Sequence, residues 1–205
     1  NEEAKNFVLQ NEKLFKTFKK AANRYIGGET LEETILSIRK LNDAGYSVTT
    51  DFMGESIRNE KDAKDATEEF VRFAKFVRKE NINSSISLDL SHIGLLVSKE
   101  LTKQNLQLIC EEANKANQEV IISMEGTDRT NQILDIYKET LETHLNLGIT
   151  VQAYLDRTKD DFKELLELSG SIRIVKGAYD TPKNLSISRG AKLDEIYLRY
   201  VEQLL

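Results

Sequence analysis

From residue 46 onward, short β-rich runs alternate with longer stretches of helical period. The runs lie at 46–52, 84–90, 119–124, 149–155 and 171–175. Two of the intervening helical stretches lie at 63–79 and 128–147. Strands that alternate with helices predict βαβ units, which build a parallel sheet. This alternation restricts the fold to the α/β class.

The order of residues within the runs separates an open sheet from a barrel. In three of the runs, every second residue is polar. These residues include Ser87 and Asp89 in the second run, Ser123 and Glu125 in the third, and Thr150 and Gln152 in the fourth. An open doubly wound sheet buries both faces against helices and should be apolar throughout, so a polar face is better explained by a barrel interior. We therefore expect a TIM-type (β/α)8 barrel whose polar inner face carries the site.

The length of the chain limits how much of a barrel it can form. A complete (β/α)8 barrel usually needs about 250 residues, whereas this chain has 205 and spends 1–45 on leading helices. We expect N-terminal helices over 1–45 and a partial barrel over 46–205, in the same domain and covering about five of the eight βα units. Either the chain is a fragment, or further strands lie outside the residues given, or it is a half-barrel with two bare sheet edges.

Two local patterns refine this prediction. Thr30-Leu31-Glu32-Glu33 has the form of a capping box and predicts that a helix begins there, after Gly27 and Gly28 break the preceding one. Asp128, which follows the third run, is expected to cap the next helix.

The composition excludes several classes of partner. With 29 basic and 34 acidic residues the net charge is −5, so neither nucleic acid nor a polybasic membrane patch is expected. Cys110, the single cysteine, is predicted to be a small buried hydrophobe, which indicates a reducing compartment. No apolar run approaches the ~18 residues of a membrane span. We expect a cytoplasmic protein, with peripheral contact at the inner face of the membrane left open.

Polar groups follow all five predicted strands. A barrel enzyme needs this arrangement, because each strand end delivers a side chain to one shared pocket. Barrel interiors can also hold polar layers without catalysis, and that alternative stays open. His92 and His144 have no second histidine or cysteine at ligand spacing, so we expect no metal there. The strand-end groups are Asp51, Glu55, Asp89, Ser123, Glu125, Gln152, Tyr154, Arg173, Lys176 and Tyr179.

Four blocks of sequence resemble one family. They are RYIGGET at 24–30, VTTDFMGE at 48–55, VQAYL at 151–155 and RIVKGAY at 173–179. In order and spacing they are similar to the blocks of monofunctional bacterial proline dehydrogenases. The resemblance implies a distorted (β/α)8 barrel that holds FAD, oxidises L-proline to 1-pyrroline-5-carboxylate and passes the electrons to a membrane quinone.

The resemblance also implies roles for single residues. Arg173 would lie beside the flavin, where a fixed positive charge favours the anionic reduced form, and Ser123 occupies the second catalytic position. Glu55, Asp89 and Tyr179 would contact the substrate. The cofactor-binding set would be Met124, Gln152, Lys176, Gly177 and Ala178.

This chain departs from the family pattern at two of these positions. The family has lysine in a Ser-Leu-Lys-Leu pattern where this chain has Asp89, and aspartate where it has Ser123. Both members of a charge-balanced pair are replaced, which we interpret as a coordinated change in a divergent subgroup. In the family, a pair of arginines binds the proline carboxylate, and the resemblance implies that this pair would lie beyond Leu205. A polypeptide ending at Leu205 is therefore expected neither to oxidise proline measurably nor to remain monomeric.

Two other functions stay open. Asp51, Asp89 and Glu125 are three inward carboxylates on the first three strands, which would suit Mg²⁺ in a barrel lyase or isomerase. A catalytically inactive barrel used for binding is the other alternative. Detection of bound flavin would favour the oxidoreductase over both of these alternatives.

Overall fold

The computed structural model describes residues 2–22 and 25–205. These residues form two compact units, Asn1–Val48 and Thr49–Leu205. Arg24, which opens the first block of the family resemblance, lies outside the described residues. Whether the N-terminal helices and the barrel segment form a single domain stays a prediction.

The first unit holds three helices, α1 (Glu2–Gln10), α2 (Glu12–Ala22) and α3 (Leu31–Asp43). Thr30 begins α3 as predicted, since its hydroxyl accepts a hydrogen bond of 3.2 Å from the backbone N–H of Glu33. The Glu33 carboxylate in turn accepts a 2.8 Å hydrogen bond from the backbone N–H of Glu29. Two otherwise unpaired donors at the helix start are thereby satisfied.

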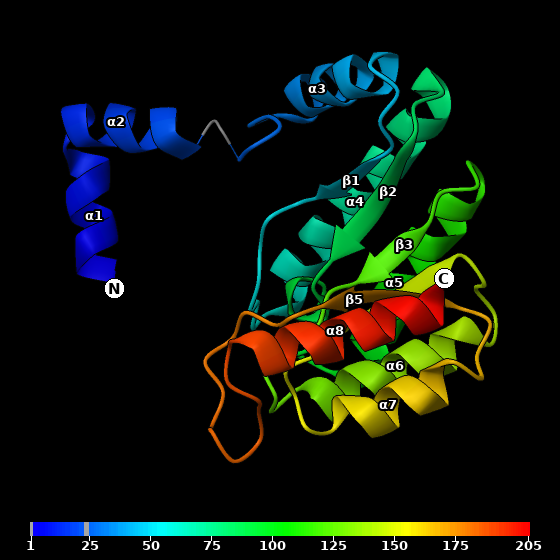
Figure 1. The fold of residues 1–205 in the computed structure, drawn as a ribbon. Helices are drawn as coiled ribbons and strands as arrows, with labels where there is room; N and C mark the ends of the chain where they lie inside the picture. The colour runs from blue at the N-terminus through cyan, green and yellow to red at the C-terminus, as the bar shows by residue number, and fades with distance from the viewer. Residues whose placement is uncertain (1, 23–24) are drawn as a thin grey trace. The chain divides into compact units, whose positions relative to one another are not determined.

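The strands form one sheet in the order β1 (Val48–Asp51), β2 (Ser84–Leu88), β3 (Val120–Ile122), β4 (Leu147–Gln152) and β5 (Ser171–Val175). The pairs from β2 to β5 are parallel. Strands that are consecutive in sequence are neighbours in the sheet, as in a barrel, and Figure 1 shows the sheet with its crossover helices. The prediction of about five βα units of a barrel is confirmed.

Five helices follow the strands: α4 (Glu60–Glu80), α5 (Lys99–Asn114), α6 (Thr130–Leu141), α7 (Thr158–Leu165) and α8 (Ala191–Leu204). Helix α4 packs on β2, α5 on β3, α6 and α7 on β4, and α8 on β5 (Figure 1). A short 3₁₀ turn, η1 (Leu90–His92), follows β2. The helix-facing side of the sheet holds the apolar members of each strand.

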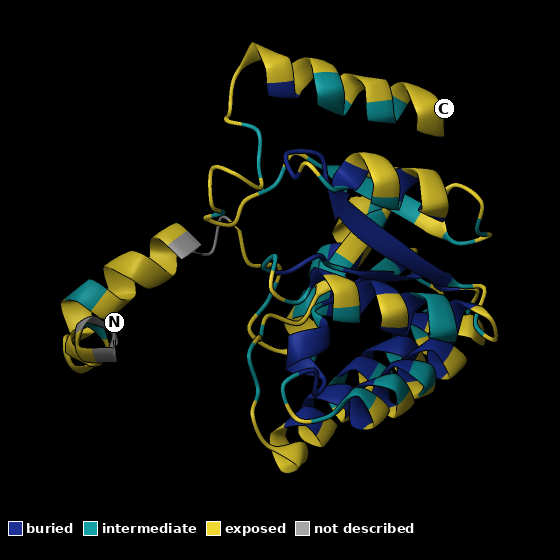
Figure 2. Cartoon of the chain, turned by 90° about the horizontal axis from the view of Figure 1, so that it is seen from below, coloured by how far each residue is buried: buried dark blue, intermediate teal, exposed yellow. Residues whose placement is uncertain are grey.

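Those apolar members form the core. Ile86, Leu88, Ile122 and Ile149 have no exposed surface, and Val151 is 3% exposed. Figure 2 shows this buried sheet layer in dark blue, whereas α8 is largely exposed. Cys110 is fully buried in α5 as predicted, and burial raises the pKa of its thiol to about 12.

Element ends differ from the sequence prediction. Strands β2, β3 and β4 stop before Asp89, Ser123 and Ala153, because the chain leaves the ladder there and turns into the loops of the strand ends. The prediction that Asp128 caps a helix is wrong: Arg129 occupies the N-cap of α6 without a side-chain hydrogen bond. Among the described residues, no helix is long and apolar enough to cross a membrane.

Candidate active site

The register of the sheet aligns four polar positions at the ends of β2 to β5. Thr150 pairs with Arg173 directly. Ser123 follows the Leu88–Ile122 and Ile122–Ile149 pairs by one residue, which places it between Asp89 and Thr150. Side chains of one row on a parallel sheet point to the same side. Asp89, Ser123, Thr150 and Arg173 therefore share the face opposite the helices, as the alternation predicted.

The guanidinium of Arg173 binds hydroxyl groups from three strands. Its Nε donates to Thr150 Oγ1 at 2.8 Å, and its Nη2 donates to Ser87 Oγ and Ser123 Oγ at 3.1 Å each. The two serine hydroxyls are themselves hydrogen-bonded, 3.1 Å apart. Desolvation by burial lowers the pKa of Arg173, while the charges of Asp51 and other carboxylates act to raise it.

The environment near this arginine disfavours the ionised form of two carboxyl groups. Burial, together with the charges of Glu125, Asp51 and Glu55, raises the pKa of Asp89 from 3.8 to about 7, and a hydrogen bond with Ser123 opposes this. Burial also raises the pKa of Asp51, an effect that the charge of Arg173 reduces. A carboxyl with a pKa near neutrality can bind or release a proton at physiological pH.

Glu125 is the buried anchor of the site. It is 1% exposed, and its two carboxylate oxygens accept hydrogen bonds from the Ser91 backbone N–H at 2.9 Å and from Arg129 Nη1 at 2.5 Å. Gln152, also buried, donates from Nε2 to the Glu125 backbone oxygen at 3.1 Å. Sequence reasoning missed Arg129 as a partner of Glu125, because both lie in the loop before α6, where no periodicity shows which side chains meet.

The loop after β5 approaches the site through Gly177. This glycine has a φ of +114°, and an added Cβ would lie 2.0 Å from the Tyr154 ring. Tyr154 donates its hydroxyl to the Tyr179 backbone oxygen at 3.2 Å. Burial, followed by the charges of Asp89 and the neighbouring carboxylates, raises the pKa of Tyr179, so its phenol lies near the acidic groups.

Four predicted site residues have less contact with this cluster. The Lys176 ammonium is paired with Asp194 of α8 at 2.6 Å and lies over the Tyr197 ring. Ala178 and Glu55 are exposed, and Glu55 acts on Asp89 through its charge. Met124 is buried beside Ser123, with 6% of its surface exposed. The roles of these residues stay predictions.

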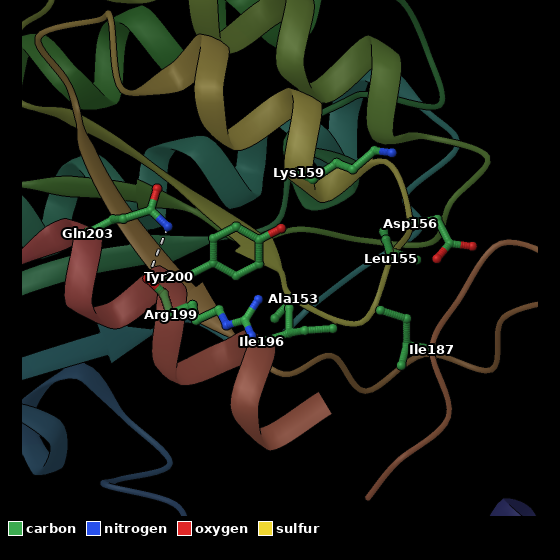
Figure 3. Close-up of a pocket in the computed structure, with 9 residues that line it drawn as sticks. All are labelled: Ala153, Leu155, Asp156, Lys159, Ile187, Ile196, Arg199, Tyr200 and Gln203. Atoms are coloured by element: carbon green, nitrogen blue, oxygen red, sulfur yellow. Dashed lines mark hydrogen bonds between the residues drawn. The ribbon is translucent and has the colours of Figure 1, made fainter. Parts of the chain in front are cut away.

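A separate cavity lies beside α8. It has a volume of roughly 390 Å³, and Figure 3 shows its lining residues, which come from α8, α7, the segment after β4 and the loop after β5. None of the predicted site residues lines it. Its lining consists of Ala153, Leu155, Asp156, Lys159, Ile187, Ile196, Arg199, Tyr200 and Gln203.

The alternative metal site finds no support in the geometry. Within residues 2–22 and 25–205, no group of three or more His, Cys, Asp or Glu side chains is arranged to hold a metal ion. Glu125, one of the three proposed ligands, already uses both oxygens on Ser91 and Arg129.

A family model described as proline dehydrogenase matches residues 34–199. This span covers most of the chain, including all five strands and the whole row of polar strand ends. The chain belongs to the proline dehydrogenase family. Membership favours the oxidoreductase interpretation over a lyase or isomerase.

Curated relatives agree with this family. Proline dehydrogenase 2 of Bacillus subtilis (strain 168) is 32% identical over 185 residues, which cover 90% of this chain and 61% of that protein. Proline dehydrogenase 1 of the same strain is 35% identical over 179 residues, which cover 84% of this chain and 59% of that protein. This chain therefore spans about 60% of the length of these relatives.

A solved structure supports the fold. Proline utilization A from Bdellovibrio bacteriovorus, inactivated by N-propargylglycine, matches with a TM-score of 0.85 at 20% identity, covering 97% of this chain and 25% of that one. At this identity the likeness shows a shared fold.

The residues present suit the flavin that the family implies. A half-buried guanidinium that no carboxylate among the described residues contacts favours an anionic group, whereas the space beside Gly177 is filled by the Tyr154 ring. Arg173, Gln152 and Gly177 would hold the cofactor, with Met124, Lys176 and Ala178 completing the predicted set.

Proposed function

We propose that this protein oxidises L-proline to 1-pyrroline-5-carboxylate with FAD as cofactor. The observation that carries the proposal is the position of Arg173, whose guanidinium is fixed at the ends of three strands on the polar face of the sheet. In a member of the proline dehydrogenase family, a fixed cation at this place suits a site where negative charge develops during reaction.

FAD, when bound, would supply the two-electron acceptor for conversion of the substrate's C–N single bond into an imine. Arg173 would stabilise the negative charge that accumulates on the acceptor side. Gln152, fixed by its hydrogen bond to the Glu125 backbone oxygen, would present its remaining amide atoms to the cofactor edge. Gly177 would allow the loop after β5 to lie close to it.

Asp89 would face the nitrogen of the substrate. The substrate's secondary amine is protonated in solution and must lose that proton before the C–N bond is oxidised. A carboxyl with a pKa of about 7 suits the exchange of that proton. The surrounding charges of Glu55, Asp51 and Glu125 also favour a cationic substrate nitrogen. Tyr179, whose phenol lies near the same carboxylates, would contact the substrate ring.

The remaining features of the proposal rest on the family resemblance. We propose a quinone as the electron acceptor, a cytoplasmic location and peripheral contact with the inner face of the membrane. Transfer of electrons from the protein to quinone-containing vesicles, with no transfer to vesicles lacking quinone, is the expected result.

The test uses the complete protein, including any residues beyond the 205 of the sequence given. Purified protein mixed with FAD should show a flavin absorbance band in the visible, and L-proline should bleach that band anaerobically. Arg173→Met should keep FAD affinity within a few-fold but slow the bleaching about 10²–10³-fold, since one electrostatic donor contributes that much. Arg157→Met is the matched control, because the Arg157 guanidinium binds Asp161 and Asn131, neither of which is a predicted site residue.

Two results would refute the proposal. A complete protein that binds no FAD would not be a flavoenzyme, and loss of activity on chelation would favour the metal-dependent alternative. Equal slowing in Arg173→Met and Arg157→Met would mean that Arg173 has no special role in flavin reduction.

A further inference from the structure

We propose that Ser87, Ser123 and Thr150 form a neutral hydroxyl cradle that positions Arg173 and keeps carboxylates out of contact with its guanidinium, which leaves the guanidinium available to an anionic partner. Neither the family match nor the resemblance assigns a role to Ser87 or Thr150. The consequence for the flavin rests on the proposed function, whereas the cradle itself does not.

The cradle is assembled from three neighbouring strands. Ser87 comes from β2, Ser123 follows β3, and Thr150 lies in β4, so each strand contributes one hydroxyl to the arginine of β5. The Ser87 and Thr150 residues are each 3% exposed, and the Ser87–Ser123 hydrogen bond of 3.1 Å ties two of the three acceptors together. Buried, mutually bonded acceptors restrict the guanidinium to one orientation.

Neutral acceptors have an electrostatic consequence. No ion pair between described residues includes Arg173, and Asp51, Asp89 and Glu119 act on it only through their charges. A carboxylate in direct contact would offset most of the guanidinium charge, whereas a hydroxyl dipole orients the group and leaves the net charge in place. Ser123 contacts Arg173 directly, so a change of charge at residue 123 acts on the guanidinium at hydrogen-bonding distance.

The cradle also determines which donors remain for a ligand. A guanidinium carries five N–H donors. The three hydrogen bonds use Nε and Nη2, and none of the hydrogen bonds between described residues uses Nη1. The geometry therefore leaves Nη1 as the nitrogen that contacts the anionic partner.

The first test requires no flavin. In the complete protein purified without FAD, exchange of the Arg173 Nε–H with water is measured by ¹⁵N NMR, and Arg173→Lys identifies its signal. Thr150→Val should accelerate this exchange at least tenfold, because it removes the acceptor of that proton. Thr49→Val is the matched control, since Thr49 bonds Ser85 and not Arg173. The Arg157 Nε–H, held by Asp161, serves as the internal reference.

The second test measures the charge effect. Ser123→Asp puts a carboxylate in contact with Arg173 and should destabilise the reduced flavin relative to the oxidised flavin at least tenfold, which lowers the midpoint potential by about 30 mV for a two-electron couple. Ser85→Asp is the control, because it adds the same charge on the neighbouring strand β2, at a residue bonded to Thr49 and not to Arg173. Its effect should be less than half as large.

The outcomes separate the cradle from the proposed function. Unchanged Nε–H exchange in Thr150→Val, or exchange equally accelerated in Thr49→Val, would overturn the cradle whether or not FAD binds. Equal potentials in Ser123→Asp and the parent, or equal shifts in Ser123→Asp and Ser85→Asp, would overturn the charge argument. A protein without bound FAD that still shows the predicted exchange pattern would support the cradle and refute the flavoenzyme instead.

Discussion

The two faces of the same sheet follow opposite chemical rules. On the side that faces the helices, the apolar side chains of Leu88, Ile122 and Val151 have almost no exposed surface. On the other side, Ser87 and Arg173 bury polar groups within a hydrogen-bonded network. The first face stabilises the fold through apolar area, and the second holds a charge in a position where a ligand can use it.

Neighbouring residues of one strand can therefore contribute separately, one to stability and the other to function. Leu88 and Ser87 are adjacent in β2, yet Leu88 packs toward the helices and Ser87 contacts Arg173. Substitutions on the helix-facing side should change the free energy of unfolding, and substitutions on the polar side should change flavin chemistry.

The largest expected effect is on the helix-facing side. Leu88→Ala should lower the free energy of unfolding by about 2–5 kcal/mol, because it leaves a cavity in a fully buried position. Ser87→Ala, one residue away, should lower it by only about 1 kcal/mol through loss of its hydrogen bonds. Urea unfolding of both variants checks this. Equal losses would break the distinction between the faces.

A backbone effect of intermediate size is expected at Gly177. Gly177→Ala should destabilise the protein by about 1–3 kcal/mol and weaken FAD binding, because φ is +114° and the added Cβ would meet the Tyr154 ring. Gly27→Ala is the control, since no atom lies within 4 Å of a Cβ added there. Thermal unfolding and FAD titration are the measurements. A fully stable Gly177→Ala protein would show that the loop after β5 is free to move.

Asp89 should make stability depend on pH. Its folded pKa of about 7 is raised above the ordinary 3.8, so its contribution to stability is fully present below about pH 4 and is lost as pH rises through 7. Asp89→Asn removes this loss and should stabilise the protein by about 1–2 kcal/mol at pH 8, with little change at pH 4. Asp128→Asn, at a side chain that is 77% exposed, should show no such dependence. Urea unfolding at pH 4 and at pH 8 measures this. Equal stabilisation by Asp89→Asn at both pH values would contradict a raised pKa of Asp89 in the folded protein.

The smallest effect is expected at Lys176. Its ammonium is paired with Asp194 at the surface, where both side chains are about half exposed, so Lys176→Ala should change stability by less than about 0.5 kcal/mol. FAD affinity should change less than threefold, because the Lys176 ammonium is held by Asp194 of α8. A tenfold loss of affinity would instead assign its side chain to the polar face.

The alternation of residues predicted both faces of the sheet because it depends only on the local period of a strand. Ser87 and Ser123 were expected on the polar side for this reason, and they contact Arg173 there. The specific network could not be predicted, since Ser87 and Arg173 are 86 residues apart and meet only through the register of four strands.

Other features depended on the loops. The ion pair of Lys176 with Asp194 requires the position of α8 relative to β5, which no periodicity encodes. Tyr154 was expected among polar strand ends, but its ring is 8% exposed and packs in a cluster with Leu155 and Leu193. Its hydroxyl alone remains polar, bonded to Thr181 at 2.7 Å and to the Tyr179 backbone.

The polar face around Arg173 is the proposed flavin site. A crystal structure of the complete protein with bound FAD tests it most directly. We expect the isoalloxazine ring over the ends of β2 to β5, with Arg173 Nη1 within hydrogen-bonding distance of the ring and the Nε and Nη2 contacts to Thr150, Ser87 and Ser123 unchanged. A flavin bound elsewhere, for example in the cavity beside α8, or an Arg173 side chain turned away from the ring, would contradict it.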